Sequence, residues 1–453
     1  MTVPFEKVLL AFYGDDFTGS TDALEVTALA GLPTVLFTRV PNAEELARFT
    51  DYPVVGIAGT ARSQSPEWME DHLPAAFEAL ARLSPRIIHY KVCSTFDSAP
   101  HTGSIGRAID IASRFVPADW SPSIVGAPHL GRWQVFGNLF AAAGGARYRI
   151  DRHPTMSRHP VTPMQESDLR LHLKAQTERT ILGIDIAAMA RGEAEAEREA
   201  ARAERAVTFL DVADDVSQRA AGQLVWEGAG EGIFSASSSG LQYALVAHWR
   251  ETGMLPRQAP SFPPPPAVER LLVLSGSCSP VTAEQIARAE EAGFAAIRLD
   301  VEAATEPTQQ EAEVARALEA AATAFATQQG VVVYAAKTVD DPAFVTLKQR
   351  AGSDPESFSA AQDAIGRTLG AIAAKAVPAF DLKRIVVAGG DTSGRVLESV
   401  PVIALEVAHP LGRGAPICRC HATDAAFEGL QVVLKGGQLG QPTLFVDALT
   451  GSA

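Results

Sequence analysis

The stretch that decides the fold is "KVLLAFYGDDFTGSTDALE", residues 7–25. A nearly continuous apolar run ends in two adjacent carboxylates, and threonine, glycine and serine follow at once. Such a run is typical of a strand buried on both faces of a parallel sheet. The polar residues favour a turn and the start of a helix. Taken alone, the stretch fits ordinary turn chemistry as well as it fits a ligand site.

The same format returns along the chain. In the first half it appears as "RIIHYKVCSTFDS" and "PSIVGAPH", and in the second half as "RLLVLSGSCS", "RIVVAGGDTSG" and "LQVVLKGGQLG". Strands that alternate with helices predict an α/β fold with largely parallel sheets. Ligands of such sheets gather beyond the carboxyl ends of the strands, so we expect these polar loops to form binding sites. After the loop at 275–279, Thr282 and Gln285 have the spacing of a capping box, which predicts a helix start there.

Length and proline content predict two domains. A chain of 453 residues is long for one core. The segment "RQAPSFPPPPAVER" contains four consecutive prolines, 263–266, which is typical of a semi-rigid spacer. We therefore predict one α/β domain over residues 1–255, a Pro-rich linker over 256–270 and a second α/β domain over 271–453.

Composition narrows the class of protein. The chain is 47% hydrophobic and 20% charged, as in ordinary globular proteins, and its net charge is −14. This balance argues against nucleic acid as a partner but leaves anionic small molecules open. No apolar stretch of about 18 residues suggests a membrane span. Four cysteines are too few for a disulfide framework, and acidic residues precede any signal-length apolar core. We expect a cytoplasmic protein, and a homo-oligomer is compatible with the sequence.

Three loops of small residues mark the second domain, at 275–279, 389–394 and 435–440. Glycines let backbone N–H groups turn toward an anion, and a following helix N-terminus favours negative charge. The combination predicts a nucleotide or phosphate site. Neither G-x-x-x-x-G-K-[ST] nor a strand-linked G-x-G-x-x-G is present, and protein-kinase signatures are missing as well. A nucleotide enzyme with this sequence would belong to a less common lineage.

The first domain carries its polar residues in three loops. These are the Asp15-Asp16 turn, "GTARS" at 59–63 and "YKVCSTFDSAPHTGSIG" at 90–106. Arg62 and Lys91 could hold a carboxylate, the arginine in bidentate fashion. Side chains able to hydrogen-bond sugar hydroxyls are Ser94, Thr95 and Asp97.

An aspartate near a substrate hydroxyl could accept its proton as the hydroxyl attacks phosphorus. If strand geometry persists through Asp15 and Asp16, their side chains point to opposite faces. Only one of them could then be the base, and the other would fix the turn or a neighbouring cation.

Two further segments carry histidine or cysteine. In "IDRHPTMSRHPVTPMQESDLRLHL", residues 150–173, His153 and His159 lack metal-ligand helix spacing, so we favour contact with an anionic substrate or loop packing over a zinc site. The "CRCH" segment at 418–421 lacks a second paired cluster and is interpreted as structural.

Together these motifs resemble the four-carbon acid sugar kinase family. "GDDFTGSTDALE" is similar to its D-D-[FL]-T-G-x-x-D signature, and "YKVCSTFDSAPHTGSIG" to its K-x-x-S-T loop. "HPVTPMQESDL" resembles the H-P-[LV]-T-P-M segment of the 3-oxo-tetronate branch. The three small-residue loops resemble the nucleotide-binding loops of the family's C-terminal domain. The resemblance runs nearly from end to end.

The resemblance implies an N-terminal domain that binds a sugar acid and a C-terminal domain that binds ATP, with phosphoryl transfer in the cleft between them. It implies Asp16 and Lys91 as catalytic residues. Sugar-acid contacts would come from Asp15, Arg62, Ser94, Thr95, Asp97 and His159. The ATP site would be lined by Ser275, Ser277, Gly389, Gly390, Asp391, Thr392, Gly436 and Gly437. Mg²⁺ is expected with ATP, with ligands that the sequence does not identify.

Departures from the family pattern concern the acid. The chain reads "FGNLFAA" with Asn138 where relatives tend to have G-H, and "HPTMSRHPVTPM" where they tend to have E-S-x-M before the proline motif. A branched acid such as 3-oxo-isoapionate therefore fits as well as 3-oxo-tetronate. Two other functions stay open. One is an aspartate-dependent phosphatase, although its aspartates usually stand two residues apart, and the other is a non-catalytic sugar-acid sensor.

Overall fold

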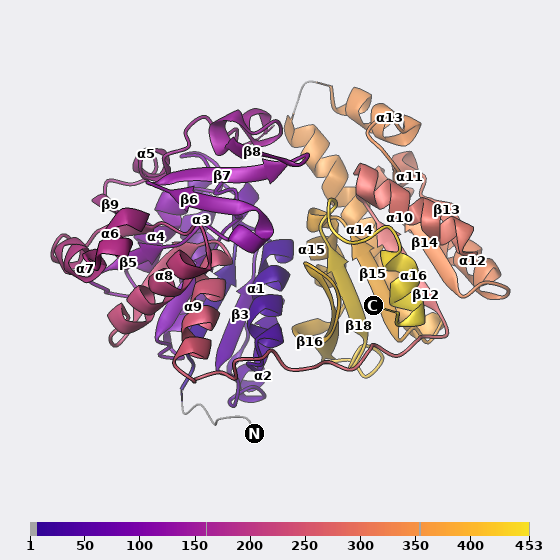
Figure 1. Cartoon of the computed structure of the whole chain (residues 1–453). Helices are drawn as coiled ribbons and strands as arrows, with labels where there is room; N and C mark the ends of the chain where they lie inside the picture. Colours follow the sequence, from indigo (N-terminus) through magenta and orange to yellow (C-terminus); the bar gives the residue numbers. More distant parts are fainter. Residues whose placement is uncertain (1–6, 160, 353–354, 453) are drawn as a thin grey trace. The chain divides into compact units, whose positions relative to one another are not determined.

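The computed structural model describes residues 7–159, 161–352 and 355–452. Its chain forms two compact units, Met1–Pro260 and Ser261–Ala453, coloured from indigo to magenta-red and from there to yellow (Figure 1). Residues 1–6, part of the segment on which the signal-peptide expectation rests, lie outside the described residues. No helix among the described residues is long and apolar enough to cross a membrane.

The first unit is built on a parallel sheet with the strand order β11-β4-β1-β3-β2. The sequence of β1 is apolar throughout, and all of its residues are buried, as expected of a strand covered on both faces. The strands are β1 (Leu10–Gly14), β2 (Thr34–Phe37), β3 (Val54–Ala58), β4 (Ile87–Lys91) and β11 (Ile233–Ser237).

Helices cover both faces of this sheet. On one face, Phe77 of α3 packs against Tyr13 and Tyr90, while Lys91, the next residue of β4, points to the opposite face and meets α1. The helices of the unit are α1 (Phe17–Leu29), α2 (Ala43–Ala47), α3 (Pro66–Ala81), α4 (Ile105–Ala112), α5 (Leu169–Lys174), α6 (Ile186–Arg191), α7 (Ala194–Ala203), α8 (Asp215–Gly228) and α9 (Gly240–Glu251).

Two smaller sheets complete the first unit. A parallel one has the order β5-β10-β9, with β5 (Ser121–Ser123), β9 (Ile181–Ile184) and β10 (Val207–Leu210). The other is antiparallel, with β6 (Arg132–Val135), β7 (Asn138–Ala143) and β8 (Ala146–Arg149). Its turns consist of two residues each, at 136–137 and 144–145, and all four have positive φ. That backbone conformation matches the twist of paired antiparallel strands, and the sequence analysis did not predict this sheet.

The second unit holds a sheet with the order β16-β17-β18-β15-β12-β14-β13. Its central strands are parallel, whereas β17 pairs antiparallel with both β16 and β18. The strands are β12 (Leu271–Ser275), β13 (Ala295–Arg298), β14 (Gly330–Tyr334), β15 (Arg384–Ala388), β16 (Val402–Gly412), β17 (Ala415–Ala422) and β18 (Gln431–Lys435). The "CRCH" segment lies in β17, where Cys418 and Cys420 are buried.

Helices α10 and α16 pack against one face of this sheet in a core that includes Val273, Ile286 and Phe445. A second group of helices is formed by α14, which contacts α11, α12, α13 and α15. The bounds are α10 (Pro280–Glu291), α11 (Val301–Thr305), α12 (Gln310–Phe325), α13 (Pro342–Ala351), α14 (Pro355–Ala379), α15 (Gly390–Glu398) and α16 (Leu444–Thr450).

The predicted capping box at Thr282 and Gln285 is wrong. Helix α10 begins at Pro280, and the Ser279 side chain caps it by accepting from the backbone N–H of Thr282. Proline at the first helical position needs no N–H partner, which favours the earlier start. Thr282 is instead fully buried, and its hydroxyl belongs to the network described below.

Candidate functional site

At the carboxyl end of β1, one arginine binds both adjacent aspartates. Arg62 Nη2 lies 2.7 Å from Asp15 Oδ1, and its Nη1 lies 2.7 Å from Asp16 Oδ2. Two further bonds, from Nε to Asp15 Oδ2 and from Nη2 to Asp16 Oδ1, measure 3.3 and 3.0 Å. The backbone N–H of Arg62 also donates to the Asp15 carbonyl oxygen. Four of the five guanidinium N–H groups of Arg62 thus donate to the two carboxylates.

The condition under which Asp15 and Asp16 would point to opposite faces is not met. Strand β1 ends at Gly14, so the alternation of a strand does not continue through the two aspartates. Asp16 is the N-cap of α1, and its Oδ1 accepts from the backbone N–H of Gly19 at 2.7 Å. The turn therefore brings both carboxylates to the same guanidinium.

Gly19 is the point where three charged groups converge. A Cβ atom at this position would lie 2.4 Å from Asp16 Oδ1, 3.1 Å from Lys91 Nζ and 3.4 Å from Arg62 Nη2. Any side chain here would displace at least the aspartate that caps α1. The glycine of the T-G-S sequence thus permits Asp16, Arg62 and Lys91 to gather at one place.

Lys91 is buried at the end of β4 and pairs with a residue that the sequence analysis missed. Its Nζ donates to the Val92 carbonyl oxygen and lies 3.4 Å from Asp22 Oδ2. Asp22 is on α1 and is the closing aspartate of the D-D-F-T-G-x-x-D signature. Its place in that motif was the available signal.

The loop after β4 brings Thr95 and Asp97 together with the segment that contains His159. The Thr95 hydroxyl donates to Asp97 Oδ1, and the Thr162 hydroxyl to Asp97 Oδ2 at 3.3 Å. His159 Nδ1 accepts from the Thr162 backbone N–H at 3.1 Å. Ser94 is half-buried in the same turn as Thr95. Apart from Ser94, the predicted sugar-acid residues therefore form two hydrogen-bonded groups, one around Arg62 and one around Asp97.

Electrostatics connect the two groups. Burial raises the pKa of Asp15 to about 6, since loss of water costs this carboxylate more than the Arg62 charge returns. Burial also acts to raise the pKa of Asp97, but the positive charge of Arg62 and the Thr95 hydroxyl outweigh it, and the pKa of Asp97 is lowered. Asp97 is therefore ionised at neutral pH.

Two other residues singled out in the sequence lie in different surroundings. His153 Nδ1 accepts from the backbone N–H groups of Thr155 and Met156, as in loop packing. Asn138 begins β7, where its Oδ1 accepts from the Ser167 hydroxyl at 2.6 Å and its Nδ2 donates to the Phe136 carbonyl oxygen. Its amide is thus engaged within the antiparallel sheet region.

In the second unit, a cavity of about 410 Å³ lies at the carboxyl ends of β12, β14, β15 and β18. The three small-residue loops meet there. Of the predicted nucleotide residues, the cavity is lined by Ser277, Gly389, Gly390, Asp391, Thr392 and Gly437. Ser275 is fully buried as the last residue of β12, and neither it nor Gly436 is among the lining residues.

Glycines let these loops approach one another, because they carry no side chain. A Cβ atom on Gly276 would lie 2.2 Å from Thr392 Oγ1, and one on Gly437 would lie 2.8 Å from Ser277 Oγ. Gly389 has φ +125°, a conformation that other residues rarely adopt. The three loops therefore contact one another closely enough to offer backbone N–H groups and hydroxyls to one ligand.

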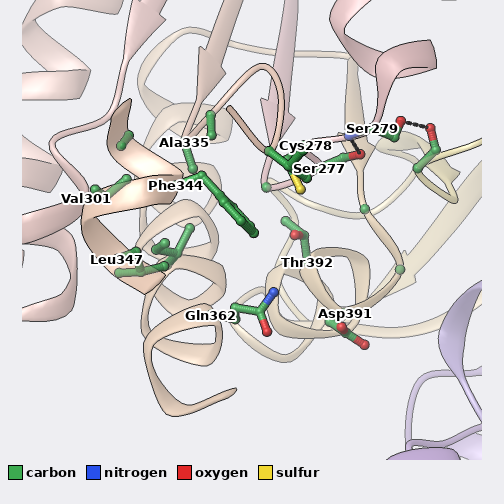
Figure 2. Close-up of a pocket in the computed structure, with 18 of the residues that line it drawn as sticks. Ser277, Cys278, Ser279, Val301, Ala335, Phe344, Leu347, Gln362, Asp391 and Thr392 are labelled. Atoms are coloured by element: carbon green, nitrogen blue, oxygen red, sulfur yellow. Dashed lines mark hydrogen bonds between the residues drawn. The ribbon is translucent and has the colours of Figure 1, made fainter. Parts of the chain in front are cut away.

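The cavity also has an apolar wall that the sequence analysis missed. Val301, Phe344 and Leu347 line one side, opposite Ser277 and Thr392 (Figure 2). Gln362 adds an amide, and further apolar lining comes from Ala335, Ala336, Val339, Ala343 and Ile365. These residues come from α11, the loop after β14, α13 and α14, so no local motif could reveal them. A cavity with one apolar side and one side rich in hydroxyls and glycine fits a planar base joined to phosphates.

No metal centre was assigned from the sequence. Within residues 7–159, 161–352 and 355–452, no group of three or more His, Cys, Asp or Glu side chains is arranged to hold a metal ion.

Comparison with family models covers both units. A model described as "Sugar-binding N-terminal domain" matches residues 10–245. A model described as "Nucleotide-binding C-terminal domain" matches residues 272–445. The first range contains the Asp15–Asp16–Arg62 group, and the second contains the 410 Å³ cavity.

Similar proteins extend over nearly the whole chain. The chain is 50% identical to 3-oxo-isoapionate kinase of Paraburkholderia graminis, over 97% of this chain and 93% of that protein. It is 30% identical to 3-oxo-tetronate kinase of Cupriavidus necator, over 98% and 97% of the two chains.

Solved structures share the fold. A protein from Haemophilus influenzae superposes with a TM-score of 0.72 at 22% identity, over 97% of this chain and 98% of that chain. A protein from Salmonella typhimurium gives a TM-score of 0.77 at 23% identity, with the same coverage. These two likenesses confirm the predicted α/β fold.

Proposed function

Since the chain belongs to the four-carbon acid sugar kinase family, we propose that it transfers the γ-phosphate of ATP to a terminal hydroxyl of 3-oxo-isoapionate. As a member of this family it is a phosphotransferase that acts on a hydroxyl of a small sugar acid. The single observation that carries the choice of acid is the 50% identity to a 3-oxo-isoapionate kinase, against 30% for a 3-oxo-tetronate kinase.

The residues around the 410 Å³ cavity fit ATP. Its apolar wall suits adenine, and the glycine and hydroxyl side suits a triphosphate. We assign phosphate contacts to Ser277, the loop Gly389–Gly390 and Thr392, together with Gly437. Asp391 would reach the nucleotide through a ribose hydroxyl or the metal ion. When bound, ATP supplies the phosphoryl group, and Mg²⁺ neutralises charge on the β- and γ-oxygens.

In the first unit, Asp16 is the better candidate for the base. Its side chain is 25% exposed, whereas that of Asp15 is 5% exposed, so Asp16 is more able to meet a substrate hydroxyl. Arg62 holds the carboxylate in a fixed orientation, and Gly19 N–H fixes one oxygen. Asp16 would accept the hydroxyl proton as the oxygen attacks phosphorus.

The remaining predicted residues would bind the acid. Lys91 places a positive charge beside Asp16, where it would attract the substrate carboxylate. Ser94, Thr95 and Asp97 offer hydroxyl and carboxylate oxygens to the sugar hydroxyls. Because Arg62 already binds two aspartates, it would contribute to carboxylate binding through its one remaining Nη1 hydrogen.

The test is product formation by the full chain with ATP and Mg²⁺. We expect ADP release with 3-oxo-isoapionate to exceed that with 3-oxo-tetronate in kcat/KM, and mass spectrometry with ³¹P NMR to place one phosphate on a terminal oxygen. Absence of acid-stimulated ADP release across a sugar-acid panel would refute the proposal. Release of phosphate from a sugar phosphate without ATP would instead identify a phosphatase, and acid binding without turnover a sensor.

A further inference from the structure

A fully buried lysine lies under the nucleotide cavity. Lys435 is the last residue of β18, and its side chain has no solvent exposure. Its Nζ donates to Thr282 Oγ1 at 2.7 Å and to the Gly437 carbonyl oxygen at 3.3 Å. Neither partner carries a charge. A buried ammonium without a carboxylate partner is costly unless another negative charge arrives, which gives this residue a reason to serve a ligand.

We propose that Lys435 is a positioning residue for nucleotide phosphates, which acts by fixing the direction of a hydrogen-bond chain through Thr282 to Ser277. This inference rests on the proposed function of the cavity as the ATP site. It assigns a role to a lysine that does not line the cavity and to a threonine that was expected only to cap a helix.

The direction of this hydrogen-bond chain follows from which groups can donate and which can accept. A lysine ammonium can donate but cannot accept, so the Thr282 oxygen must accept from Lys435. The Thr282 hydroxyl proton then points to Ser277 Oγ or to the Gly437 carbonyl oxygen, both at 3.0 Å. The Gly437 carbonyl oxygen already accepts from Lys435 and from the Ser279 hydroxyl, which leaves Ser277 Oγ as the acceptor for the Thr282 proton.

Ser277 is the member of this hydrogen-bond chain that lines the cavity. Its Oγ accepts from the Ser279 backbone N–H at 3.3 Å, an interaction drawn in Figure 2, and is within reach of the Thr282 proton. With its lone pairs used in this way, the Ser277 hydroxyl keeps its own proton to donate to an anion. A charged Lys435 thus makes Ser277 a donor, which is the polarity that a phosphate oxygen requires.

The elements around Lys435 carry several titratable groups, but in the described part of the chain none of them is a partner of the lysine. They include Cys278 after β12, Glu284, Glu290 and Glu291 on α10, Asp391 and Glu398 on α15, and Cys418, Cys420 and His421 on β17. Among the described residues, Lys435 Nζ donates to Thr282 and to Gly437. Burial lowers the pKa of Lys435 to about 8. The polyanionic part of a nucleotide is therefore the negative charge best placed to balance this lysine.

The experiment compares ligands with and without phosphates. Binding of ADP and of adenosine to the full chain is measured by calorimetry at pH 7 for the wild type, Lys435→Met, Thr282→Val and Ser277→Ala. We expect each variant to weaken ADP binding about 10- to 100-fold, because a charge-assisted chain is broken. Adenosine binding should change less than about twofold, because adenosine lacks the group that the chain serves.

A matched control and a double variant separate this role from a structural one. Thr368→Val also deletes a fully buried threonine hydroxyl in the second unit, one that bonds Ala304 and Ala364 carbonyl oxygens, and should leave ADP affinity unchanged. The double variant Lys435→Met/Ser277→Ala should bind ADP no more weakly than Lys435→Met alone, because both substitutions interrupt the same hydrogen-bond chain.

Several outcomes would overturn the inference. Unchanged ADP affinity in folded Lys435→Met and Thr282→Val would do so, and so would an equal loss of adenosine and ADP binding. Thr282→Val preserves side-chain shape and carries the test if Lys435→Met does not fold. A wild type that binds neither ADP nor ATP would overturn the proposed function itself. That result differs from a wild type that binds ADP and variants that bind it equally well.

Discussion

The two polar sites of the molecule handle charge in opposite ways. At the carboxyl end of β1, one guanidinium, that of Arg62, binds the carboxylates of both Asp15 and Asp16 at 2.7 Å. At the carboxyl end of β18, the cavity presents glycines and hydroxyls, and the nearby buried Lys435 has only neutral partners among the described residues. The two sites therefore suit different tasks. Carboxylates held by a cation can orient a base for a hydroxyl, whereas a cation without a carboxylate partner favours the binding of an anion.

The largest expected effect comes from the base in the first unit. Asp16→Asn keeps an oxygen that can cap α1 but removes the proton acceptor, so turnover should fall by about two to four orders of magnitude. ADP affinity should stay within about twofold if the two sites have separate tasks. Steady-state kinetics and calorimetry measure the two effects.

A matched control is Asp214→Asn, which changes another N-cap aspartate, at the start of α8. It should leave turnover unchanged. Near-normal turnover of Asp16→Asn would move the role of the base elsewhere, with Asp15 as the next candidate.

Removing the cation of the first site should lower the free energy of unfolding. Arg62→Met leaves Asp15 buried and Asp16 half-buried without their cation, and we expect the free energy of unfolding to fall by about 3 kcal/mol. Urea denaturation at pH 7.5 measures the loss. Arg82→Met removes an exposed pair with Glu78 and should cost little. Equal effects of the two variants would show that the Arg62 pairs contribute no more than a surface ion pair.

Loop contact in the second site can be tested with one methyl group. In Gly276→Ala the new Cβ atom would lie 2.2 Å from Thr392 Oγ1, so the Thr392 side chain or the loops must shift. We expect ADP to bind about tenfold more weakly, in line with the usual cost of overpacking. Gly412→Ala is the control, because its Cβ atom would meet Leu444 at an ordinary 3.4 Å. Undiminished ADP binding by Gly276→Ala would mean that close approach of these loops is not needed.

A further expected effect is a pH dependence of stability. In the folded chain the pKa of Lys435 is about 8, below its ordinary value of 10.5, so the unfolded chain binds more protons between these values. The stability of the wild type relative to Lys435→Met should therefore rise as pH increases from 8 to 10.5. ADP affinity should fall over the same range, because the lysine loses its charge. Thermal melts and calorimetry at several pH values check both signs.

A relative stability that falls or stays level over that range would show that burial does not lower the pKa of Lys435. If ADP affinity stays constant while the relative stability rises, the charge of Lys435 does not contribute to nucleotide binding.

Parallel strands and their polar loops were predictable because each loop follows its strand directly in the sequence. Antiparallel pairs were not, since β6 and β7 depend on a turn in which Phe136 adopts φ 50°, an unusual value for an aromatic residue. The orientation of Asp15 and Asp16 could be predicted only conditionally, because it depends on the residue at which β1 ends. A shift of one residue moves a side chain from one face to the other.

The site was predictable where residues are close in sequence and hidden where they are not. Asp16 and Ser277 stand in short motifs, whereas Phe344 and Gln362 reach the cavity from helices α13 and α14. Asp22 was within the quoted signature, but its pairing with Lys91 depends on how α1 lies against β4. Lys435 ended an apolar strand, and its burial could not be read from that pattern.

The thiol of Cys278 gives the nucleotide cavity a chemical handle. Cys278 lies half-buried in the loop after β12, directly beside Ser277 on the cavity wall (Figure 2). Because burial raises its pKa, it would react slowly with electrophiles that meet it by collision. An adenosine-like compound that carries a mild electrophile would hold that electrophile next to the Cys278 thiol. This proximity would speed up their reaction. The cavity is therefore suited to selective covalent inhibition of this kinase.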